Sequence, residues 1–506
     1  MLSHGRRALI ALAAATGLIV AGCTNSGATG AAPETKMGND TAKPAASAAA
    51  ATPAASEAPL EITGKFALAP QHGPWGTAVT ATASGLKAQT AYDVVWTTVD
   101  GKWQLSADKA EYKGRAYVPV QKVIKKVTTD AAGGFVTTFA VPENDFGFQH
   151  DVLVRANGEE IIRNKAGFDV DLQVSTSPKS GPPGTPITIE ARGIGWRQLE
   201  NSWLVSYDNS FTGWISSVTT KGYAKAVIPA TGAVGTHVIT VLHGDFTFPY
   251  LNMQQSPEPG RPMFRIPFTI TDGTAVLPAP ASTQSLAVSA AQPVASGIWF
   301  DPPSGIVGAK TVLKGAGLPP TAELDVEWTS MSGNRVSGSG YEETKNSLGK
   351  ARTDGNGQLT WAFTVPDDLG GAHTLSLARG DTAIAKTTFT ILASIQPLAV
   401  DRGPSGTQIT MQLNGVGWTE TANIFNITYD NSYAGYACGF NSGGNVQVVF
   451  TVSGAPGWHY IDFYPGIYKG TETRPLNFRV PQLTYADDHP AEKLPAFHLA
   501  FLITTP

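Results

Sequence analysis

The sequence predicts an all-β protein made of four β-sandwich domains, in which one pair of domains occurs twice. The composition favours this class, because 54 glycines and 35 prolines stand among 506 residues and only 15% of the residues are charged. A chain that is also rich in threonine and valine suits short strands joined by turns and suits helices badly. The second observation is internal repetition, because the same motifs recur at a nearly constant displacement in both halves of the chain.

The N-terminus has the parts of a secretory signal. His4, Arg6 and Arg7 form a short basic region, residues 8–20 are an apolar run, and small residues lead into Cys23. A basic region, a short apolar run and a small-residue cleavage site are the features of such a signal. The apolar run is too short for a bilayer core, which needs about 20 residues. We therefore expect residues 1–22 to be a signal peptide and not a membrane span.

The end of this signal, Val20-Ala21-Gly22-Cys23, resembles the lipobox of bacterial lipoproteins. The resemblance implies cleavage before Cys23 and acylation of its thiol, so that the membrane is a partner through the N-terminal lipid. The residue after the cysteine is Thr24 and not an aspartate. By resemblance to the sorting rules of Gram-negative lipoproteins, this favours the outer membrane. The alternative is an ordinary signal peptide in which the cysteine is coincidental.

Two segments of low complexity divide the rest of the chain. Residues 23–58 are dominated by Ala, Pro, Thr, Ser and Gly, and a similar stretch covers residues 272–297. Both are too poor in large apolar residues to fold, so we interpret them as a tether and a linker. The predicted domains are A1 (59–170), B1 (171–271), A2 (298–392) and B2 (393–506).

The repeats define the duplication. In the A domains, Asp93-Val94-Val95-Trp96-Thr97 recurs 232 residues later as Asp325-Val326-Glu327-Trp328-Thr329. In the B domains, Tyr207-Asp208-Asn209-Ser210 recurs 222 residues later as Tyr429-Asp430-Asn431-Ser432. The apolar C-terminal residues 497–504 match residues 264–271 at a displacement of 233. We therefore predict that they are the last strand of B2, with about eleven extra residues in the preceding loops, and not a membrane anchor.

The openings of the domains share a pattern of turn, glycine, strand and glycine. In A2 it reads Pro303-Ser304-Gly305 to Gly308, followed by a strand and Gly315-Ala316-Gly317. This pattern resembles bacterial immunoglobulin-like domains of the IPT/TIG kind, and the Thr-Asp-x-x-Gly, strand, Val-Pro runs of A1 and A2 resemble Ig-like repeats of bacterial surface proteins. The resemblance implies four tandem Ig-like β-sandwiches as a duplicated A-B pair, and this fold serves many functions.

One histidine per domain follows a glycine ahead of an alternating strand: His150, His237, His373 and His459. Histidines so far apart cannot share one metal ion without a special assembly, so no metal site is expected. Ig-like folds often place here a tyrosine that fixes a neighbouring loop, and a histidine ring nitrogen can do the same. We also expect Trp96 and Trp328 to pack in the cores of their sandwiches. The Thr-Asp-x-x-Gly segments are predicted to be hairpin turns rather than calcium loops.

The B-domain motif carries the candidate ligand-binding residues. Asp-Asn between two alternating strands predicts a tight hairpin. The aromatic side chains on the two arms could simply pair across the strands. They could also form an exposed platform for sugar rings or for an apolar patch of a protein partner, and two copies would add avidity. The candidate residues are Trp203, Tyr207, Asp208, Asn209, Phe211, Trp214, Tyr429, Asp430, Asn431, Tyr433 and Tyr436.

Cys438 stands where the first copy of this motif has Ser216. The exchange suggests a small buried residue whose size matters more than its sulfur, and intermolecular pairing is the alternative. If Cys23 carries lipid, no intrachain disulfide forms, because the chain has only 2 cysteines. Each domain must then fold on the burial of its own core, which about 100 residues can supply.

The expected function is non-enzymatic. The chain has none of the common nucleophile, zinc, phosphate-loop or paired-cysteine motifs, and its net charge of −4 gives no footprint for nucleic acid. We expect no nucleotide and no cofactor. The chain is expected to be a cell-envelope lipoprotein that presents Ig-like domains for adhesion, for glycan or polymer binding, or for scaffolding with an envelope protein partner. The alternatives are an accessory or catalytic role in extracellular polymer breakdown and a purely structural spacer.

Overall fold

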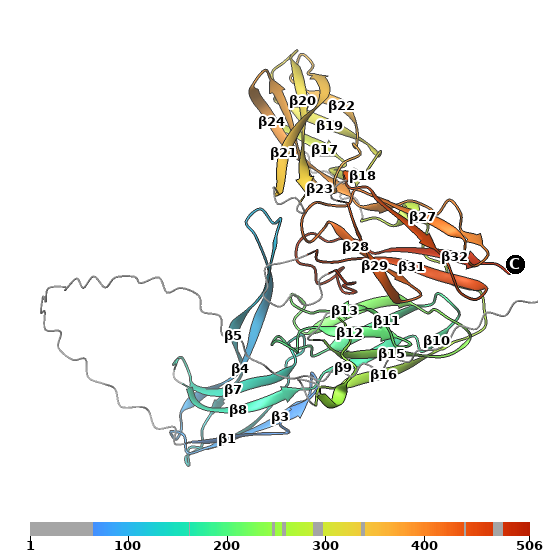
Figure 1. Ribbon diagram of the computed structural model, residues 1–506. Helices are drawn as coiled ribbons and strands as arrows, with labels where there is room; N and C mark the ends of the chain where they lie inside the picture. The colour runs from blue at the N-terminus through green and yellow to red at the C-terminus, as the bar shows by residue number, and fades with distance from the viewer. Residues whose placement is uncertain are drawn as a thin grey trace, which may run out of the picture. The chain divides into compact units, whose positions relative to one another are not determined.

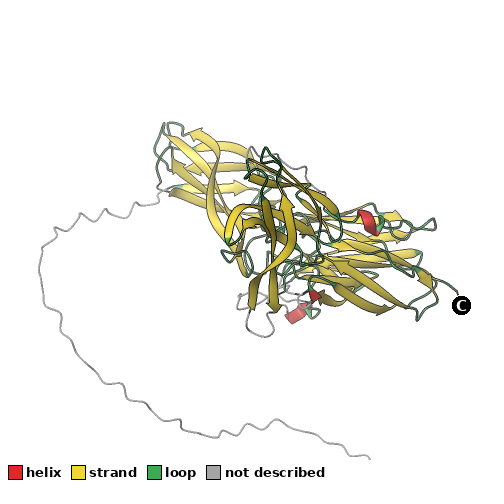
Figure 2. Ribbon diagram, turned by 90° about the horizontal axis from the view of Figure 1, so that it is seen from above, coloured by secondary structure: helices red, strands yellow, loops and turns green. Residues whose placement is uncertain are grey.

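The computed structural model describes residues 64–160, 162–244, 248–255, 260–286, 297–334, 340–439, 442–468 and 479–505. The chain divides into the units Met1–Leu60 and Glu61–Pro506, and all the strands belong to the second unit. The predicted signal peptide, Cys23 and the first tether lie outside the described residues. Within the described part, the fold consists of strands and two short 3-10 turns, Met253–Gln255 and Ala281–Thr283 (Figure 2). No described helix is long and apolar enough to cross a membrane.

Each A domain pairs a three-stranded with a five-stranded sheet. The orders are β1-β3-β6 and β2-β8-β7-β4-β5 in A1, and β17-β19-β22 and β18-β24-β23-β20-β21 in A2 (Figure 1). The strands of A1 are β1 (Lys65–Ala69), β2 (His72–Gly73), β3 (Ala78–Ser84), β4 (Ala91–Leu105), β5 (Tyr112–Thr128), β6 (Phe135–Ala140), β7 (Phe148–Ala156) and β8 (Ile162–Val170). Those of A2 are β17 (Gly297–Asp301), β18 (Ser304–Ile306), β19 (Lys310–Ala316), β20 (Glu323–Asn334), β21 (Gly340–Arg352), β22 (Leu359–Thr364), β23 (Gly371–Arg379) and β24 (Thr382–Leu392).

The B domains repeat the same plan. Their sheets are β14-β11-β9 and β10-β16-β15-β12-β13 in B1, and β25-β27-β30 and β26-β32-β31-β28-β29 in B2. The strands of B1 are β9 (Gln173–Ser177), β10 (Ser180–Gly181), β11 (Pro186–Arg192), β12 (Trp203–Tyr207), β13 (Ser210–Ile215), β14 (Tyr223–Pro229), β15 (Gly235–His243) and β16 (Met263–Ile270). Those of B2 are β25 (Ser394–Ile395), β26 (Arg402–Gly403), β27 (Gln408–Asn414), β28 (Ile424–Tyr429), β29 (Ser432–Cys438), β30 (Val446–Thr451), β31 (Gly457–Pro465) and β32 (Phe497–Ile503).

The four sandwiches are Ig-like in topology. In each, a short strand near the start (β2, β10, β18 or β26) runs parallel to the last strand, and the other pairings are antiparallel. The prediction of a duplicated all-β fold is therefore confirmed. The C-terminal prediction is confirmed as well, because β32 pairs antiparallel with β31 just as β16 pairs with β15.

Each sandwich has its own hydrophobic core. Trp96 and Trp328 are 0% and 1% exposed and lie in the cores of A1 and A2, as predicted. Trp203 of B1 and Phe425, at the same place in B2, are both fully buried. A large aromatic side chain therefore fills each core, but Trp203 and Phe425 lie four residues before Tyr207 and Tyr429, which are the B-domain equivalents of Trp96.

The four repeated histidines tie loops to sheets, as the sequence predicts. In each domain the Nε2 atom pairs with the backbone carbonyl four residues earlier, at 2.9 Å for His150, 2.7 Å for His237, 2.7 Å for His373 and 2.9 Å for His459. Each ring also stacks on the strand aromatic at the equivalent position, with Trp96 under His150 at a centroid distance of 4.4 Å. The structural role expected for these histidines is confirmed.

Candidate functional site

The B-domain hairpins turn as their sequence predicts. Asp208 and Asn209 have φ angles of 46° and 66°, and Asp430 and Asn431 have 48° and 62°. Two consecutive residues with positive φ make a type I′ turn, which matches the twist of the flanking strands. The turn carboxylates then reach the repeated histidines, at 2.5 Å from Asp208 to His237 and 2.6 Å from Asp430 to His459.

The alternative of an exposed aromatic platform is wrong for the first hairpin, whose aromatic side chains are buried or half-buried. Trp203, Tyr207 and Trp214 are 0%, 3% and 2% exposed. Trp203 and Tyr207 point into the B1 core, because they alternate with residues of the opposite face. Phe211 and Tyr433 are half-buried against each other, with ring centroids 6.2 Å apart.

Six of the candidate residues remain to be placed. Asn431 is fully buried, Tyr429 and Asp430 are half-buried, and Asp208 and Asn209 are exposed at the turn. Tyr436 is 42% exposed, and the guanidinium of Arg479 donates to its hydroxyl at 3.2 Å. The two copies of the motif therefore differ in exposure.

A segment of B2 covers the first hairpin. Residues 480–484 lie along β13, the edge strand of the B1 sheet, where the Trp214 amide donates to Pro481 at 2.9 Å and the Leu483 amide donates back to Trp214 at 2.8 Å. A Cβ at Gly213 would stand 2.6 Å from the Pro481 carbonyl, so only glycine fits beneath this segment. The side chains of Trp214, Leu204, Leu242 and Val480 form a small core of their own between the two domains.

The second hairpin contacts B1 in return. The Asn431 side chain donates to the Pro229 carbonyl at 2.8 Å and to the Thr231 hydroxyl at 3.2 Å. The Tyr207 hydroxyl donates to the Thr231 carbonyl at 3.0 Å from within B1. The repeated motif therefore lies at the boundary of the two B domains, and β13 and β29 lie beside each other there.

A buried carboxylate joins three domains. Asp488 is 1% exposed and lies in the B2 loop between β31 and β32, which holds the extra residues of the second copy. Its Oδ2 accepts from the Ser216 hydroxyl at 2.6 Å and from the Val218 amide at 2.8 Å. Its Oδ1 accepts from the Thr219 amide and hydroxyl, both at 2.8 Å, and from the indole of Trp103 in A1 at 3.1 Å. Such charge-assisted bonds are the strong ones in proteins.

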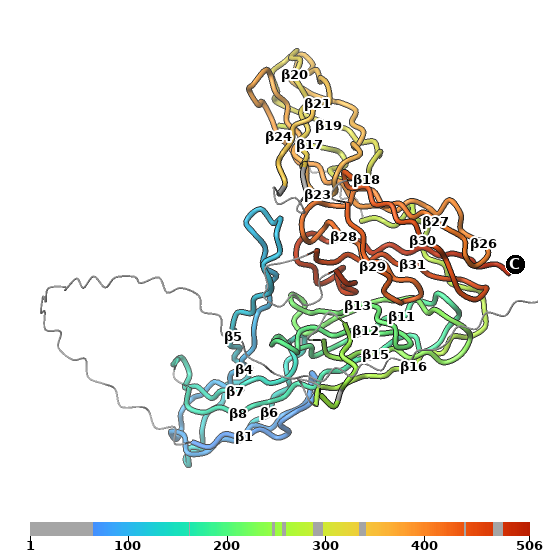
Figure 3. The backbone as a smooth tube through the Cα atoms, in the orientation of Figure 1, coloured from blue at the N-terminus to red at the C-terminus, as the bar shows by residue number. Residues whose placement is uncertain are grey.

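The long hairpin of A1 also reaches B2. Figure 3 shows β4 and β5 running together out of A1 toward B2. At its tip, the Glu420 amide donates to the Ala110 carbonyl at 2.8 Å, and the Tyr112 amide donates to the Glu420 carboxylate at 2.9 Å. The sequence contains no local sign of these contacts, because their partners are about three hundred residues apart.

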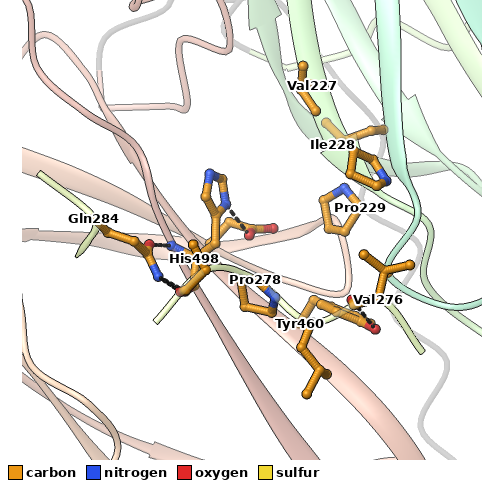
Figure 4. Close-up of a pocket in the computed structure, with 13 residues that line it drawn as sticks. Val227, Ile228, Pro229, Val276, Pro278, Gln284, Tyr460 and His498 are labelled. Carbon is orange, nitrogen blue, oxygen red and sulfur yellow. Dashed lines mark hydrogen bonds and ion pairs between the residues drawn. The ribbon is translucent and has the colours of Figure 1, made fainter. Parts of the chain in front are cut away.

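A cavity of about 160 Å³ lies where B1, the linker and B2 meet (Figure 4). The β14 residues Val227, Ile228 and Pro229 form one wall, and residues 276–279 of the linker form another. On the B2 side, Tyr460, Asp462 and His498 line it. Sequence reasoning missed this site, because no motif marks it and its three walls are distant in the chain.

The polar groups of the cavity are arranged around His498. Its Nδ1 lies 2.7 Å from the carboxylate of Asp462, which is 1% exposed. Burial lowers the pKa of His498, but the hydrogen bond and the charge of Asp462 outweigh it, so the pKa stands above the usual value of a histidine. Among the residues that the structure describes, no cluster of three or more His, Cys, Asp or Glu could hold a metal ion.

Cys438 is exposed, and the expectation of a small buried residue is wrong. Its counterpart Ser216 is 0% exposed because the B2 loop with Asp488 and Thr484 covers it. The two positions are equivalent in the repeat but differ in what packs on them.

No protein-family model matches the chain, and no curated protein matches it in sequence. Among solved structures, an alpha-2-macroglobulin of Salmonella is 10% identical, with 88% of this chain covered and a TM-score of 0.17. The chain spans only 31% of that protein. A putative membrane-anchored protein from Corynebacterium diphtheriae is 12% identical, with 65% of this chain and 89% of that chain covered and a TM-score of 0.18.

A tetra-tandem repeat in the extending region of a large adhesion protein is 11% identical, with 85% of this chain and 96% of that chain covered and a TM-score of 0.15. At these TM-scores the likeness carries no argument about activity or partners. The Ig-like fold is evident from the sheets of this chain alone.

Proposed function

We propose that this protein is a non-enzymatic lipoprotein of the cell envelope that acts as a scaffold, holding its Ig-like domains in one arrangement rather than as freely jointed modules. The observation that carries the proposal is Asp488, whose buried carboxylate accepts five hydrogen bonds from A1 and B1. A buried charge is costly unless it is fully bonded. A contact of this kind suits a fixed domain arrangement better than a transient one.

The two A-B junctions support the same reading. The Gly147 amide of A1 donates to Ile194 of B1 at 3.0 Å, and the Gly370 amide of A2 donates to Val416 of B2 at 3.0 Å. A Cβ at either glycine would collide with backbone of the next domain, so the domains meet backbone to backbone. The same junction is therefore used twice, and the B1–B2 contact connects the two pairs.

The anchoring part of the proposal rests on the N-terminal motif that ends in Cys23. We expect wild-type protein in the membrane fraction of the native cells, and we expect Cys23→Ala to appear intact in the soluble fraction. A Cys438→Ala variant is the matched control, because it removes the other cysteine and should stay with the membrane. If Cys23→Ala protein stays with the membrane as well, lipid anchoring through this residue is wrong.

The scaffolding part is tested by small-angle X-ray scattering of the mature chain without its lipid. We expect a single compact distance distribution for the residues from 64 onward, and a broader one with a larger maximum dimension after Asp488→Asn. A neighbouring exposed carboxylate provides the control, because Asp487→Asn should leave the distribution unchanged. If the wild-type chain already scatters as freely jointed domains, the scaffold proposal is wrong.

A further inference from the structure

The cavity between B1, the linker and B2 has walls held by specific bonds. The side chain of Gln284 donates to the His498 carbonyl at 2.8 Å and accepts from the His498 amide at 2.6 Å, so it fastens the linker to β32. The Tyr460 hydroxyl donates to the Val276 carbonyl at 3.1 Å, and the Val276 amide donates to Pro183 of B1 at 2.8 Å. The linker is thus bonded to both B domains at the cavity.

The lining exposes apolar side chains to water. Val227, Val276 and Leu277 are 42%, 39% and 49% exposed, although large aliphatic side chains gain about 25 cal/mol for each Å² that they bury. Their grouping around one cavity marks a place where an apolar partner would be stabilised. A volume of about 160 Å³ is close to that of a cavity that takes up a benzene-sized molecule, and it far exceeds the space of one water.

Among the polar side chains that line the cavity, the imidazole of His498 is the one that a ligand could use. The amide of Gln284 and the hydroxyl of Tyr460 are engaged with the backbone. The Nδ1–H of His498 is bonded to Asp462, which orients the ring and leaves Nε2 as its other polar atom. The side chain of His498 is 39% exposed, whereas its Asp462 partner is 2% exposed.

We propose that this cavity binds a small molecule, or the end of a longer one, with a branched or cyclic apolar body of roughly five to seven carbon atoms and a carboxylate or carbonyl oxygen that accepts a hydrogen bond from Nε2 of His498. The apolar body lies against β14 and the linker. This proposal rests on the proposed fixed arrangement of the domains, because B1 and B2 both supply walls of the cavity; scattering tests the arrangement and calorimetry tests the binding, so the two failures are distinguishable.

The comparison of the two B domains supports a special role for Asp462 and His498. At the equivalent places in B1, Thr240 and Arg265 stand for Asp462 and His498. The buried carboxylate and histidine pair is thus present in one copy of the repeat and absent from the other. The common fold of the B domains does not require the pair.

Protonation of His498 favours the ligand. Asp462 on β31 is the charged group that faces the ring, and Tyr460 and Tyr464 of the same strand stay neutral because burial raises their pKa values. The linker residues 276–286 and the β14 residues 226–229 carry no titratable side chain. A protonated ring donates from Nε2 to a carboxylate, whereas a neutral ring with its proton on Nδ1 cannot. Binding of a carboxylate should therefore weaken as the pH rises through the pKa of His498.

Isothermal titration calorimetry tests the proposal with 4-methylpentanoate and 4-methylpentanamide as probes. We expect both to bind the wild-type chain if a carbonyl oxygen suffices, and only the acid to bind if the charge is needed. His498→Asn keeps an N–H where Nδ1 bonds Asp462 but removes Nε2, and it should weaken binding about tenfold or more. Arg265→Gln, at the equivalent exposed position of B1, should leave binding unchanged.

A second variant guards against an effect on folding. Leu277→Ser lies in the linker outside all four sandwiches and removes part of the apolar wall, so it should weaken both probes without lowering the melting temperature. The proposal is overturned if neither probe binds the wild-type chain in the millimolar range, or if binding survives unchanged in both His498→Asn and Leu277→Ser.

Discussion

The indole of Trp103 donates a hydrogen bond to the carboxylate of Asp488 at 3.1 Å, across 385 residues of sequence. Trp103 lies near the end of β4 in A1, and Asp488 lies in a B2 loop that is longer than its B1 counterpart. The same carboxylate accepts hydrogen bonds from the hydroxyl groups of Ser216 and Thr219 in B1. Asp488 of B2 is therefore bonded to both A1 and B1.

Asp488→Asn should destabilise the protein by about 2–4 kcal/mol. The reason is geometric: each carboxylate oxygen accepts from a backbone amide, Val218 at one and Thr219 at the other. An asparagine NH₂ group would face one of these N–H donors, whichever way the side chain turned. Urea unfolding followed by tryptophan fluorescence measures the change. Asp487→Asn, at an exposed neighbour, should change the free energy of unfolding by less than about 0.5 kcal/mol.

Trp214→Ala should cost about 3–5 kcal/mol, because the residue is 2% exposed and packs between the two B domains. Tyr436→Ala, at the equivalent position of B2, should cost less than about 1 kcal/mol, because that ring is 42% exposed. Thermal unfolding of the two variants compares them directly. Equal melting temperatures for the two variants would be incompatible with the burial of Trp214.

The turn asparagines should differ in the same way. Both have positive φ, so glycine satisfies the backbone at either site. Asn431→Gly nevertheless removes the two hydrogen bonds to B1 and should cost about 1–3 kcal/mol. Asn209→Gly, at the exposed turn, should change stability by less than about 0.5 kcal/mol. Chemical denaturation gives both values, and a larger loss at Asn209 would argue against the contact between the B domains.

His459 should make part of the stability depend on pH. The hydrogen bond that His459 donates to the Asp430 carboxylate raises the pKa of His459 in the folded state above its unfolded value of about 6.5. This contribution is therefore fully present below pH 6.5 and is lost as the pH rises through the folded pKa. His459→Asn, which keeps a donor for Asp430 but does not titrate, should flatten the decline of the unfolding free energy above neutral pH. An unchanged slope would show that His459 is not the source.

His150 should act in the opposite direction. Burial lowers the pKa of His150 in the folded state, so its contribution is complete above the unfolded value of about 6.5 and is lost as the pH falls toward the folded pKa. The expected result is that His150→Gln reduces the loss of stability between neutral and mildly acidic pH. Urea unfolding at several pH values measures it, and no difference from wild type would contradict the assignment.

The fold could be predicted because its signals are local or periodic. The duplication identifies β13 and β29 as equivalent strands, and the Asp-Asn pairs mark the turns before them. Each repeated histidine forms a hydrogen bond with a backbone carbonyl four residues earlier. These features depend on residues close together in the chain, so each copy of the repeat forms them independently. The core tryptophans Trp96 and Trp328 follow from the same alternation.

The site could not be predicted because it depends on contacts between copies. Trp214 and Tyr436 are equivalent in sequence, yet the B2 loop covers only the first of them. Ser216 and Cys438 differ in exposure for the same reason. Extra residues in the second copy were visible in the sequence, but nothing local indicated that they lie on the edge of B1. The cavity at His498 likewise needs three segments that only the folded chain brings together.

Hydrogen exchange at the Trp214 amide tests the central claim most directly, namely that the B2 loop pairs with the edge of the B1 sheet. This amide donates to the Pro481 carbonyl, so its exchange in the wild-type chain should be as slow as that of amides within the sheet. Asp488→Asn should accelerate exchange at Trp214 while leaving the β11 amides protected. Exchange at Trp214 in the wild-type chain at the rate of an open edge strand would contradict the account.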